Sequence, residues 1–317
     1  MSTNDSATTG ERKSKARSKQ PAKPTAEVGS TVPRRQLGRH LRELRQQTGM
    51  SIAEVAKLIE RGATTLQRLE AGTADRIRLW DIEALCRVLG ADETTTDALK
   101  GLAQQGNTES WWHEYGDLIP KDFDVYIGLE SAASKLTSFQ ELVPGLFQTP
   151  GYAETLIRAV FPEEPSSEIT RRVEMRMHRQ RLITRKGRPA AVDVILDESV
   201  LRRMVGSPRI MADQLRHLAD LSTKPNITVR VLPYVAGVPL GDLTGPFTIV
   251  DFAPDAKGKH EPSVVYVENF TGAMYLEGLG SVSRYRAAHE TIGRVALGAQ
   301  PSRDLLRRAA REYERER

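Results

Sequence analysis

The chain has 317 residues, of which 39% are hydrophobic and 27% charged, and its formal net charge is +5. This length is enough for two or three domains, and the composition is typical of a soluble globular protein. The apolar runs are too short to span a bilayer, and the N-terminus lacks the apolar core of a secretory signal. The single cysteine, Cys86, follows an apolar helical pattern, so we expect it to be buried and the protein to be cytoplasmic.

Positive charge is concentrated toward the N-terminus. Residues 1–30 contain six Lys or Arg and three Asp or Glu, residues 34–79 contain ten and five, and residues 80–317 contain thirty and thirty-three. This distribution indicates a polyanionic partner, with a solubilising tail as the alternative. Residues 1–32 have almost no large apolar side chains, so we expect a disordered basic tail. The tail either follows a DNA duplex or is an inert extension, and both interpretations stay open.

The rest of the chain divides into two predicted domains, which we call the head (residues 33–106) and the body (residues 107–317). The head has helical periodicity interrupted by glycines, whereas short strand-like runs begin in the body at about residue 188. Strands are predicted at residues 190–196, 227–233, 245–252, 263–269 and 272–276, and helices at 211–221 and 302–317. The expected class is α+β, with an all-helical head and a larger body of helices and antiparallel strands.

The head has the layout of a helix-turn-helix. A first helix with leucines at i, i+4 and i+7 ends at Gly49, where a left-handed cap favours glycine. Ser51 and Glu54 have the spacing of a capping box and begin a second helix. Gly62 is expected to allow a tight turn before a third helix over residues 63–71.

The segment LRELRQQTGMSIAEVAKLIERGATTLQRLEAG, followed by IEALCRVLG, resembles the Cro/C1-type helix-turn-helix domains of the XRE family. The resemblance implies that the third helix enters the major groove of double-stranded DNA. The positions that it implies as DNA contacts are Ser51, Ala63, Thr64, Thr65, Gln67 and Arg68. Ser51 would hold a phosphate at the start of the second helix, while Gln67 and Arg68 have the chemistry to contact adenine and guanine.

Two positions depart from the family pattern, and one pair matches it. Ile52 and Ala63 stand where family members often have glutamine. The resemblance therefore does not indicate which bases the third helix contacts. The resemblance also implies an ion pair between Arg45 and Glu70, to which we assign a structural role because a half-buried charge needs a partner.

The body contains no motif of a known catalytic, phosphate-binding or metal site, so we expect no enzymatic activity, no cofactor and no metal. The arginine-rich run MRMHRQR at residues 175–181 has helical spacing. A solvated or ion-paired helix face is favoured there over a second site for a polyanion.

Two segments of the body form a candidate ligand or partner patch. It consists of Trp111, Trp112, Tyr115, Leu146, Phe147 and Gln148. For the aromatic residues we favour packing between domains or subunits over stacking on nucleobases. The run VPGLFQTPGY at residues 143–152 is predicted as a rigid turn that leads into a helix capped by Thr149. Its apolar residues are expected in the core, with the lip of a pocket or partner groove as the alternative.

The body also resembles actinobacterial helix-turn-helix regulators of the WhiJ-like type, whose C-terminal domain has no assigned biochemistry. The blocks SWWHEYGDLIPKDFDVYIGLESAA, ELVPGLFQTPGYAETLI, LDESVLRRMVG, VRVLPYVAGVP and GPFTIVDF occur in this order. The resemblance implies a developmental or antitoxin-like transcriptional regulator, commonly encoded beside a small partner protein. In the cytoplasm we expect the protein to be associated with the nucleoid. We expect a homodimer that binds an operator and responds to a small molecule or small protein. The alternatives are an antitoxin-like module that binds a small cognate protein and, less favoured, an enzyme with a DNA-binding head.

Overall fold

The computed structural model describes residues 31–74, 76–108, 110–254, 258 and 260–315. The predicted basic tail lies outside the described residues except for Thr31 and Val32, which are helical. In the part of the chain that is described, no helix is long and apolar enough to cross a membrane.

The head is a bundle of short helices. They are α1 (Thr31–Thr48), α2 (Ile52–Leu58), α3 (Ala63–Ala71), α4 (Leu79–Val88) and α5 (Glu93–Gly106). Leu37 and Leu41 of α1 are fully buried against Leu66 and Leu69 of α3, as the leucine spacing predicts. Cys86 of α4 is buried in the same core, and its burial raises the pKa of its thiol. The head therefore holds α3 against a continuous apolar core.

The body contains one sheet and the helices that cover it. Its helical elements are η1 (Trp111–Tyr115), α6 (Lys121–Ala132), η2 (Gly145–Phe147), α7 (Pro150–Val160), α8 (Ser166–Arg179), α9 (Arg181–Thr184), α10 (Ser199–Arg202), α11 (Pro208–Leu221), η3 (Tyr234–Ala236), α12 (Leu279–Val295) and α13 (Ala299–Arg315). Its strands are β1 (Ala133–Gln140), β2 (Ala191–Asp197), β3 (Ile227–Leu232), β4 (Phe247–Phe252), β5 (Val264–Asn269) and β6 (Gly272–Leu276). The expected α+β class is confirmed.

The sheet is mixed, in the order β3-β2-β1-β4-β5-β6. Strands β1, β2 and β3 are parallel, whereas β4, β5 and β6 pair antiparallel. The expectation of antiparallel strands is therefore correct for only half of the sheet. The physical reason is that helices α7 to α9 join β1 to β2, and α10 and α11 join β2 to β3; such helical crossovers place consecutive strands parallel.

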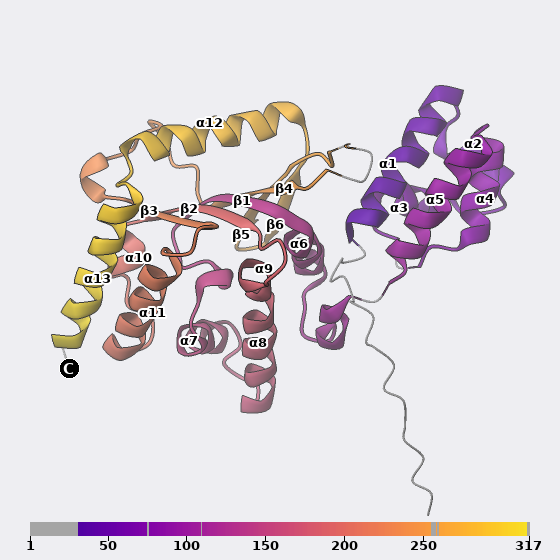
Figure 1. The fold of residues 1–317 in the computed structure, drawn as a ribbon. Coiled ribbons are helices and arrows are strands. Elements are labelled where there is room, and N and C mark those ends of the chain that lie inside the picture. Colours follow the sequence, from indigo (N-terminus) through magenta and orange to yellow (C-terminus); the bar gives the residue numbers. More distant parts are fainter. Residues whose placement is uncertain (1–30, 75, 109, 255–257, 259, 316–317) are drawn as a thin grey trace, which may run out of the picture.

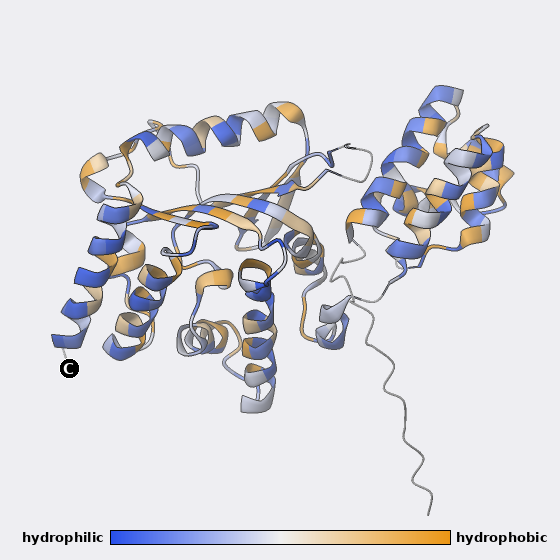
Figure 2. Cartoon of the chain, in the orientation of Figure 1, coloured by the Kyte–Doolittle hydropathy of each residue, from blue (hydrophilic) through white to orange (hydrophobic). Residues whose placement is uncertain are grey.

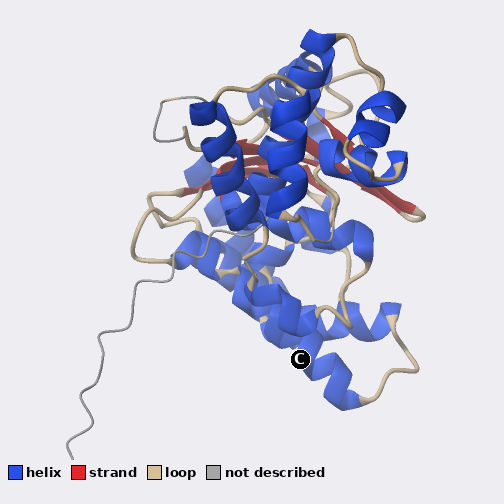
Figure 3. Cartoon of the chain, turned by 90° about the vertical axis from the view of Figure 1, so that its right-hand side faces the viewer, coloured by secondary structure: helices blue, strands red, loops and turns tan. Residues whose placement is uncertain are grey.

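Helices cover both faces of the sheet. Figure 1 shows α12 lying across one face, while α7, α8, α10 and α11 lie on the other. Figure 3 shows the same layers after a quarter turn, with the head in front. Hydrophobic residues are concentrated on the strands in Figure 2, whereas α8 and α13 are largely hydrophilic. The strands are thus buried between two helical layers, and each layer has its own apolar core.

The head meets the body through α1 and α6. Gly128 of α6 lies so close to Thr31 of α1 that a Cβ at this glycine would overlap the threonine side chain. Arg35 of α1 pairs with Glu277, which follows β6. A second α1 residue, Arg39, pairs with Glu261, which precedes β5. The helix that supports α3 is therefore also the helix that contacts the body.

Candidate nucleic-acid interface and ligand pocket

The segment between α2 and α3 forms the predicted turn, but a residue other than Gly62 has the left-handed backbone conformation. The Ser51 hydroxyl accepts from the Glu54 amide at 3.3 Å, and the Ser51 amide donates to the Glu54 carboxylate at 2.8 Å, which confirms the capping box. The left-handed residue of the turn is Glu60, with φ of 53°. Gly62 is extended, with φ of −71°, because it is the N-cap of α3, so the expectation that its freedom makes the turn is wrong.

The exposed face of α3 consists of the residues predicted to contact DNA. They are Ala63, Thr64, Thr65, Gln67 and Arg68, and all of them are exposed. Between them, Leu66 and Leu69 are only 1% and 4% exposed. Among the described residues, no carboxylate forms an ion pair with Arg68. The apolar side of α3 is therefore fixed in the core, and its polar side chains are free to contact base edges.

Ser51, the remaining predicted DNA contact, is exposed but already bonded within its own helix. The amide and the hydroxyl of Ser51 lower the pKa of Glu54, so this carboxylate is charged at the start of α2. A phosphate at the same place would meet that negative charge. The phosphate contact of Ser51 stays a prediction.

Arg45 and Glu70 form the ion pair that the resemblance implies. Arg45 donates from Nε to Glu70 Oε1 at 2.6 Å and from Nη2 to Oε2 at 2.8 Å. A third bond joins Arg45 Nη1 to the carbonyl of Met50 at 3.0 Å, at the junction of α1 and α2. The hydrogen bonds to Glu70 raise the pKa of Arg45. This arginine therefore ties α1, α3 and the start of α2 together.

Glu70→Ala is expected to lower the free energy of unfolding of the head by about 2–3 kcal/mol, because it leaves Arg45 without its carboxylate in a mostly buried position. Thermal unfolding followed by circular dichroism measures this loss. Glu43→Ala is the matched control, since Glu43 is an exposed residue of α1 whose one ion pair among the described residues is with His40. A Glu70→Ala melting temperature equal to that of Glu43→Ala would contradict the structural role.

The body contains a pocket of about 1010 Å³. One wall is the face of the sheet opposite α12, including Ser138 and Gln140 of β1. The other walls are α6, α7, α8 and the turn at residues 141–148. A row of hydroxyl-bearing residues crosses the strands of this wall, because Ser138 pairs with Thr248 and Thr248 pairs with Tyr266. The size and the mixed apolar and polar lining are typical of a small-molecule site.

Three arginines of α8 line the pocket, at spacings i, i+4 and i+7: Arg172, Arg176 and Arg179. Arg172 forms two hydrogen bonds with the Glu164 carboxylate, at 2.8 and 2.6 Å. Arg179 does the same with Glu130 of α6, at 2.8 Å for both bonds, and both side chains are at most 6% exposed. Two of the three cations are therefore neutralised by carboxylates.

The third arginine, Arg176, has no carboxylate at ion-pair distance within the described part of the chain. Its Nη1 donates to the side-chain oxygen of Gln148 at 2.8 Å. Burial, followed by the positive charge of Arg179, lowers the pKa of Arg176 to about 10. The charges of Glu268 and Glu130 act against this lowering, but neither carboxylate is within ion-pair distance of Arg176. Arg176 is still a cation at neutral pH, in a partly buried position without a directly paired anion among the described residues.

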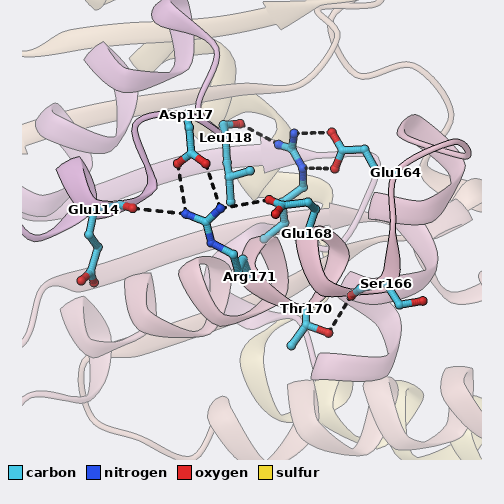
Figure 4. A network of polar contacts seen from close by, with 9 residues as sticks. Glu114, Asp117, Leu118, Glu164, Ser166, Glu168, Thr170 and Arg171 are labelled. Carbon is cyan, nitrogen blue, oxygen red and sulfur yellow. Dashed lines mark hydrogen bonds and ion pairs between the residues drawn. The ribbon is translucent and has the colours of Figure 1, made fainter.

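The segment between the head and the body is bonded to the same helix. Arg171 of α8 forms two hydrogen bonds with Asp117, at 2.8 and 3.1 Å (Figure 4). Arg172 donates to the carbonyl of Leu118 at 2.6 Å. The Arg171 guanidinium lowers the pKa of Asp117. Helix α8 therefore connects the pocket wall with the segment that leads from the head.

Comparison with known protein families matches both domains. Residues 36–99 match a helix-turn-helix domain, which supports a DNA-binding regulator. Residues 123–308 match a domain described as a domain of unknown function, DUF5753. The chain belongs to the DUF5753 family. No curated protein matches the sequence of the chain. The three arginines of α8 that line the pocket, and all of the lining except Leu118, Ile119 and Pro120, lie within the matched residues 123–308.

The structure divides the predicted ligand or partner patch in two. Trp111, Trp112 and Tyr115 pack beside α8: Trp112 is 1% exposed and donates to Asp124 at 2.7 Å, and Trp111 stacks on His178 with ring centres 4.0 Å apart. None of these three residues lines the large pocket of the DUF5753 domain.

Leu146, Phe147 and Gln148 do line that pocket, and all three are buried. Thr149 caps α7 and Pro150 occupies its first turn, as predicted. The turn is therefore both a core connector and a wall of the pocket, so the two interpretations of this segment coexist.

Sequence reasoning did not single out Arg176 among the residues that line the pocket of the DUF5753 domain. The interpretation of residues 175–181 as an ion-paired helix face describes Arg179, but Arg176 has no such partner among the described residues. The signal that could have found it is the i, i+4, i+7 spacing of the arginines, which places three cations on one face of a helix.

Proposed function

We propose that this protein is a sequence-specific transcriptional regulator of the Cro/C1 type, related to the WhiJ-like regulators and associated with chromosomal DNA. In this proposal the head contacts an operator through α3, and the DUF5753 domain forms a homodimer and binds a small molecule or small protein that regulates DNA binding. The main support is that the polar side of α3 is exposed while Leu66 and Leu69 fix its orientation.

Dimer formation is proposed because one half-site of a few base pairs cannot select a locus, whereas two half-sites one helical turn apart can. The loop around η3 supports a protein contact. Its apolar side chains Tyr234, Val235, Val238 and Leu243 are 57%, 93%, 55% and 80% exposed.

Helix α6 supports the regulatory part of the proposal. Its residues Phe123, Tyr126 and Glu130 line the pocket, while Gly128 packs against Thr31 of α1. Occupancy of the pocket would thus act on a helix that also contacts the support of α3. We propose binding rather than catalysis in the pocket, because its buried carboxylate, Glu130, is held in an ion pair with Arg179.

Selection of DNA fragments from a random pool by the full chain tests the proposed function. We expect enrichment of one motif made of two related half-sites whose centres are separated by about 10 base pairs or a multiple of it. Recovery of fragments with no common motif would contradict sequence-specific binding.

Arg68→Ala is expected to weaken binding to the enriched motif by about 1–3 kcal/mol, or up to about a hundredfold in Kd, with a smaller effect on unrelated DNA. The reason is that Arg68 is an exposed residue of α3 with the geometry to contact guanine through two hydrogen bonds. Fluorescence anisotropy titrations on both DNAs measure the two losses. Equal losses on both would show that Arg68 contacts only phosphate.

An antitoxin-like module that binds a small cognate protein is the second candidate function, and the exposed apolar loop around η3 favours it equally. Co-expression with the product of an adjacent gene, followed by mass measurement in solution, separates the two. A chain that enriches one DNA motif when it is free of the small protein supports the first function, whereas a stable complex with the small protein from a chain that enriches no motif supports the second.

A further inference from the structure

We propose that the pocket of the DUF5753 domain binds a small apolar molecule with a single carboxylate group, and that Arg176 is the residue that binds the carboxylate. The inference rests on the proposed function, since it names the chemical class of the regulatory ligand. It is carried by the charges, the lining and the free hydrogen-bond donors of the pocket.

The charges of the pocket specify one negative charge on the ligand. Glu130 neutralises Arg179, and Glu164 neutralises Arg172. Three further charged residues of the lining, Glu141, Arg203 and Glu268, are exposed to solvent, and the charge of Glu268 acts on Arg176 only from beyond ion-pair distance. Arg176 is therefore the partly buried cation left without a counter-ion among the described residues. A monoanion balances it, whereas a molecule with several phosphates would bring excess charge into a partly apolar site.

The apolar side chains of the pocket lining indicate that the rest of the ligand is apolar. Phe123, Leu146, Phe147, Ile157 and Met175 are among its members, and they come from α6, the turn after β1, α7 and α8. A volume of about 1010 Å³ accepts a molecule well above the size of a free amino acid.

The mouth of the pocket is apolar as well. Leu142, Val160 and Phe270 belong to the lining, yet they are 38%, 67% and 106% exposed. Large exposed apolar side chains at the entrance favour an apolar molecule over a sugar or a nucleotide.

The N–H donors of Arg176 indicate that the charged group of the ligand is a carboxylate. A guanidinium has five N–H donors, and the hydrogen bond to Gln148 uses one of them. The remaining donors can form the paired bonds that an arginine makes with a carboxylate. Gln148 is itself fixed, because its amide donates to the carbonyl of Val143 at 2.7 Å. One hydrogen bond to a fixed acceptor therefore holds the guanidinium at the pocket wall before a ligand arrives.

Displacement of a neutral dye from the full chain tests the proposal. N-phenyl-1-naphthylamine, which fluoresces in apolar pockets, is bound first and then displaced by decanoate or by decanol. The two compounds have the same chain length and differ in charge. We expect decanoate to displace the dye at a concentration at least tenfold lower than decanol, and Arg176→Met to abolish this difference.

Two further variants keep the test independent of folding. Arg176→Lys keeps the positive charge and is expected to preserve a preference for decanoate. Arg158→Met removes an exposed arginine of α7 that lies outside the pocket lining and is expected to behave as the unaltered chain. Equal displacement by decanoate and decanol, or a preference for decanoate that survives in Arg176→Met, would overturn the carboxylate site.

The same compounds added to the DNA-binding assay separate this inference from the proposed function. A change in the affinity for the enriched motif on addition of decanoate, lost in Arg176→Met, supports both. Displacement that depends on Arg176 without any change in DNA affinity would overturn the regulatory role and leave the carboxylate site standing.

Discussion

Arg179→Ala is expected to lower the free energy of unfolding of the body by about 3–5 kcal/mol, because it leaves the Glu130 carboxylate buried without its cationic partner. Glu130 is 2% exposed, and its two oxygens both accept from Arg179. Burial alone would lower the pKa of Arg179, but the charge and the hydrogen bonds of Glu130 raise it above its usual value. Urea unfolding followed by tryptophan fluorescence measures the loss, since Trp112 is buried beside α8.

Two further variants test whether the loss of stability in Arg179→Ala comes from the buried, unpaired charge of Glu130. Arg158→Ala breaks an exposed pair with Glu154 on α7 and is expected to cost only about 0.3–0.5 kcal/mol. Replacement of both buried partners, as Glu130→Leu with Arg179→Met, is expected to recover most of the stability lost in Arg179→Ala. A double variant that is as unstable as the single one would contradict the charge-burial explanation.

Gly38→Ala is expected to destabilise the head by about 3 kcal/mol or more, although alanine is the better helix former. A Cβ at this position of α1 would lie 2.5 Å from the Leu69 carbonyl oxygen and 2.6 Å from that of Glu70. Both atoms belong to the backbone of α3, so relief requires α3 to move. Hydrogen exchange of the α1 and α3 amides measures the loss, and DNA binding should weaken with it.

Gly101→Ala is the matched control, because Gly101 is also a helical glycine of the head and a Cβ there would meet no atom within 4 Å. It is expected to leave exchange unchanged or slower. Equal protection of α1 and α3 in Gly38→Ala and Gly101→Ala would show that the two helices do not pack as described.

Local patterns predicted most of the elements. The helices of the head follow from leucine spacing, a capping box and terminal glycines, and β2 to β6 follow from runs of β-branched and aromatic residues. The central strand β1 was not predicted, because its sequence ASKLTSFQ has only two large apolar residues. Small and polar residues are tolerated there because Ser138 and Gln140 face the pocket and Ser134 donates to the backbone of β4.

The two candidate sites differ in how far sequence could predict them. The face of α3 lies on one helix, so periodicity alone separates Thr64, Thr65, Gln67 and Arg68 from Leu66 and Leu69. The pocket combines residues from α6, α7, α8 and the sheet, which are brought together only by the crossover connections. A spacing pattern can place Arg176 beside Arg172 and Arg179, but it cannot show that Glu130 and Glu164 neutralise only the other two.

The most direct test of base contact by α3 is a second selection from the random DNA pool with Arg68→Ala in place of the unaltered chain. If Arg68 contacts a base, the enriched motif keeps its spacing and loses its preference at one base pair in each half-site. An unchanged motif, recovered in smaller amounts, would contradict the account.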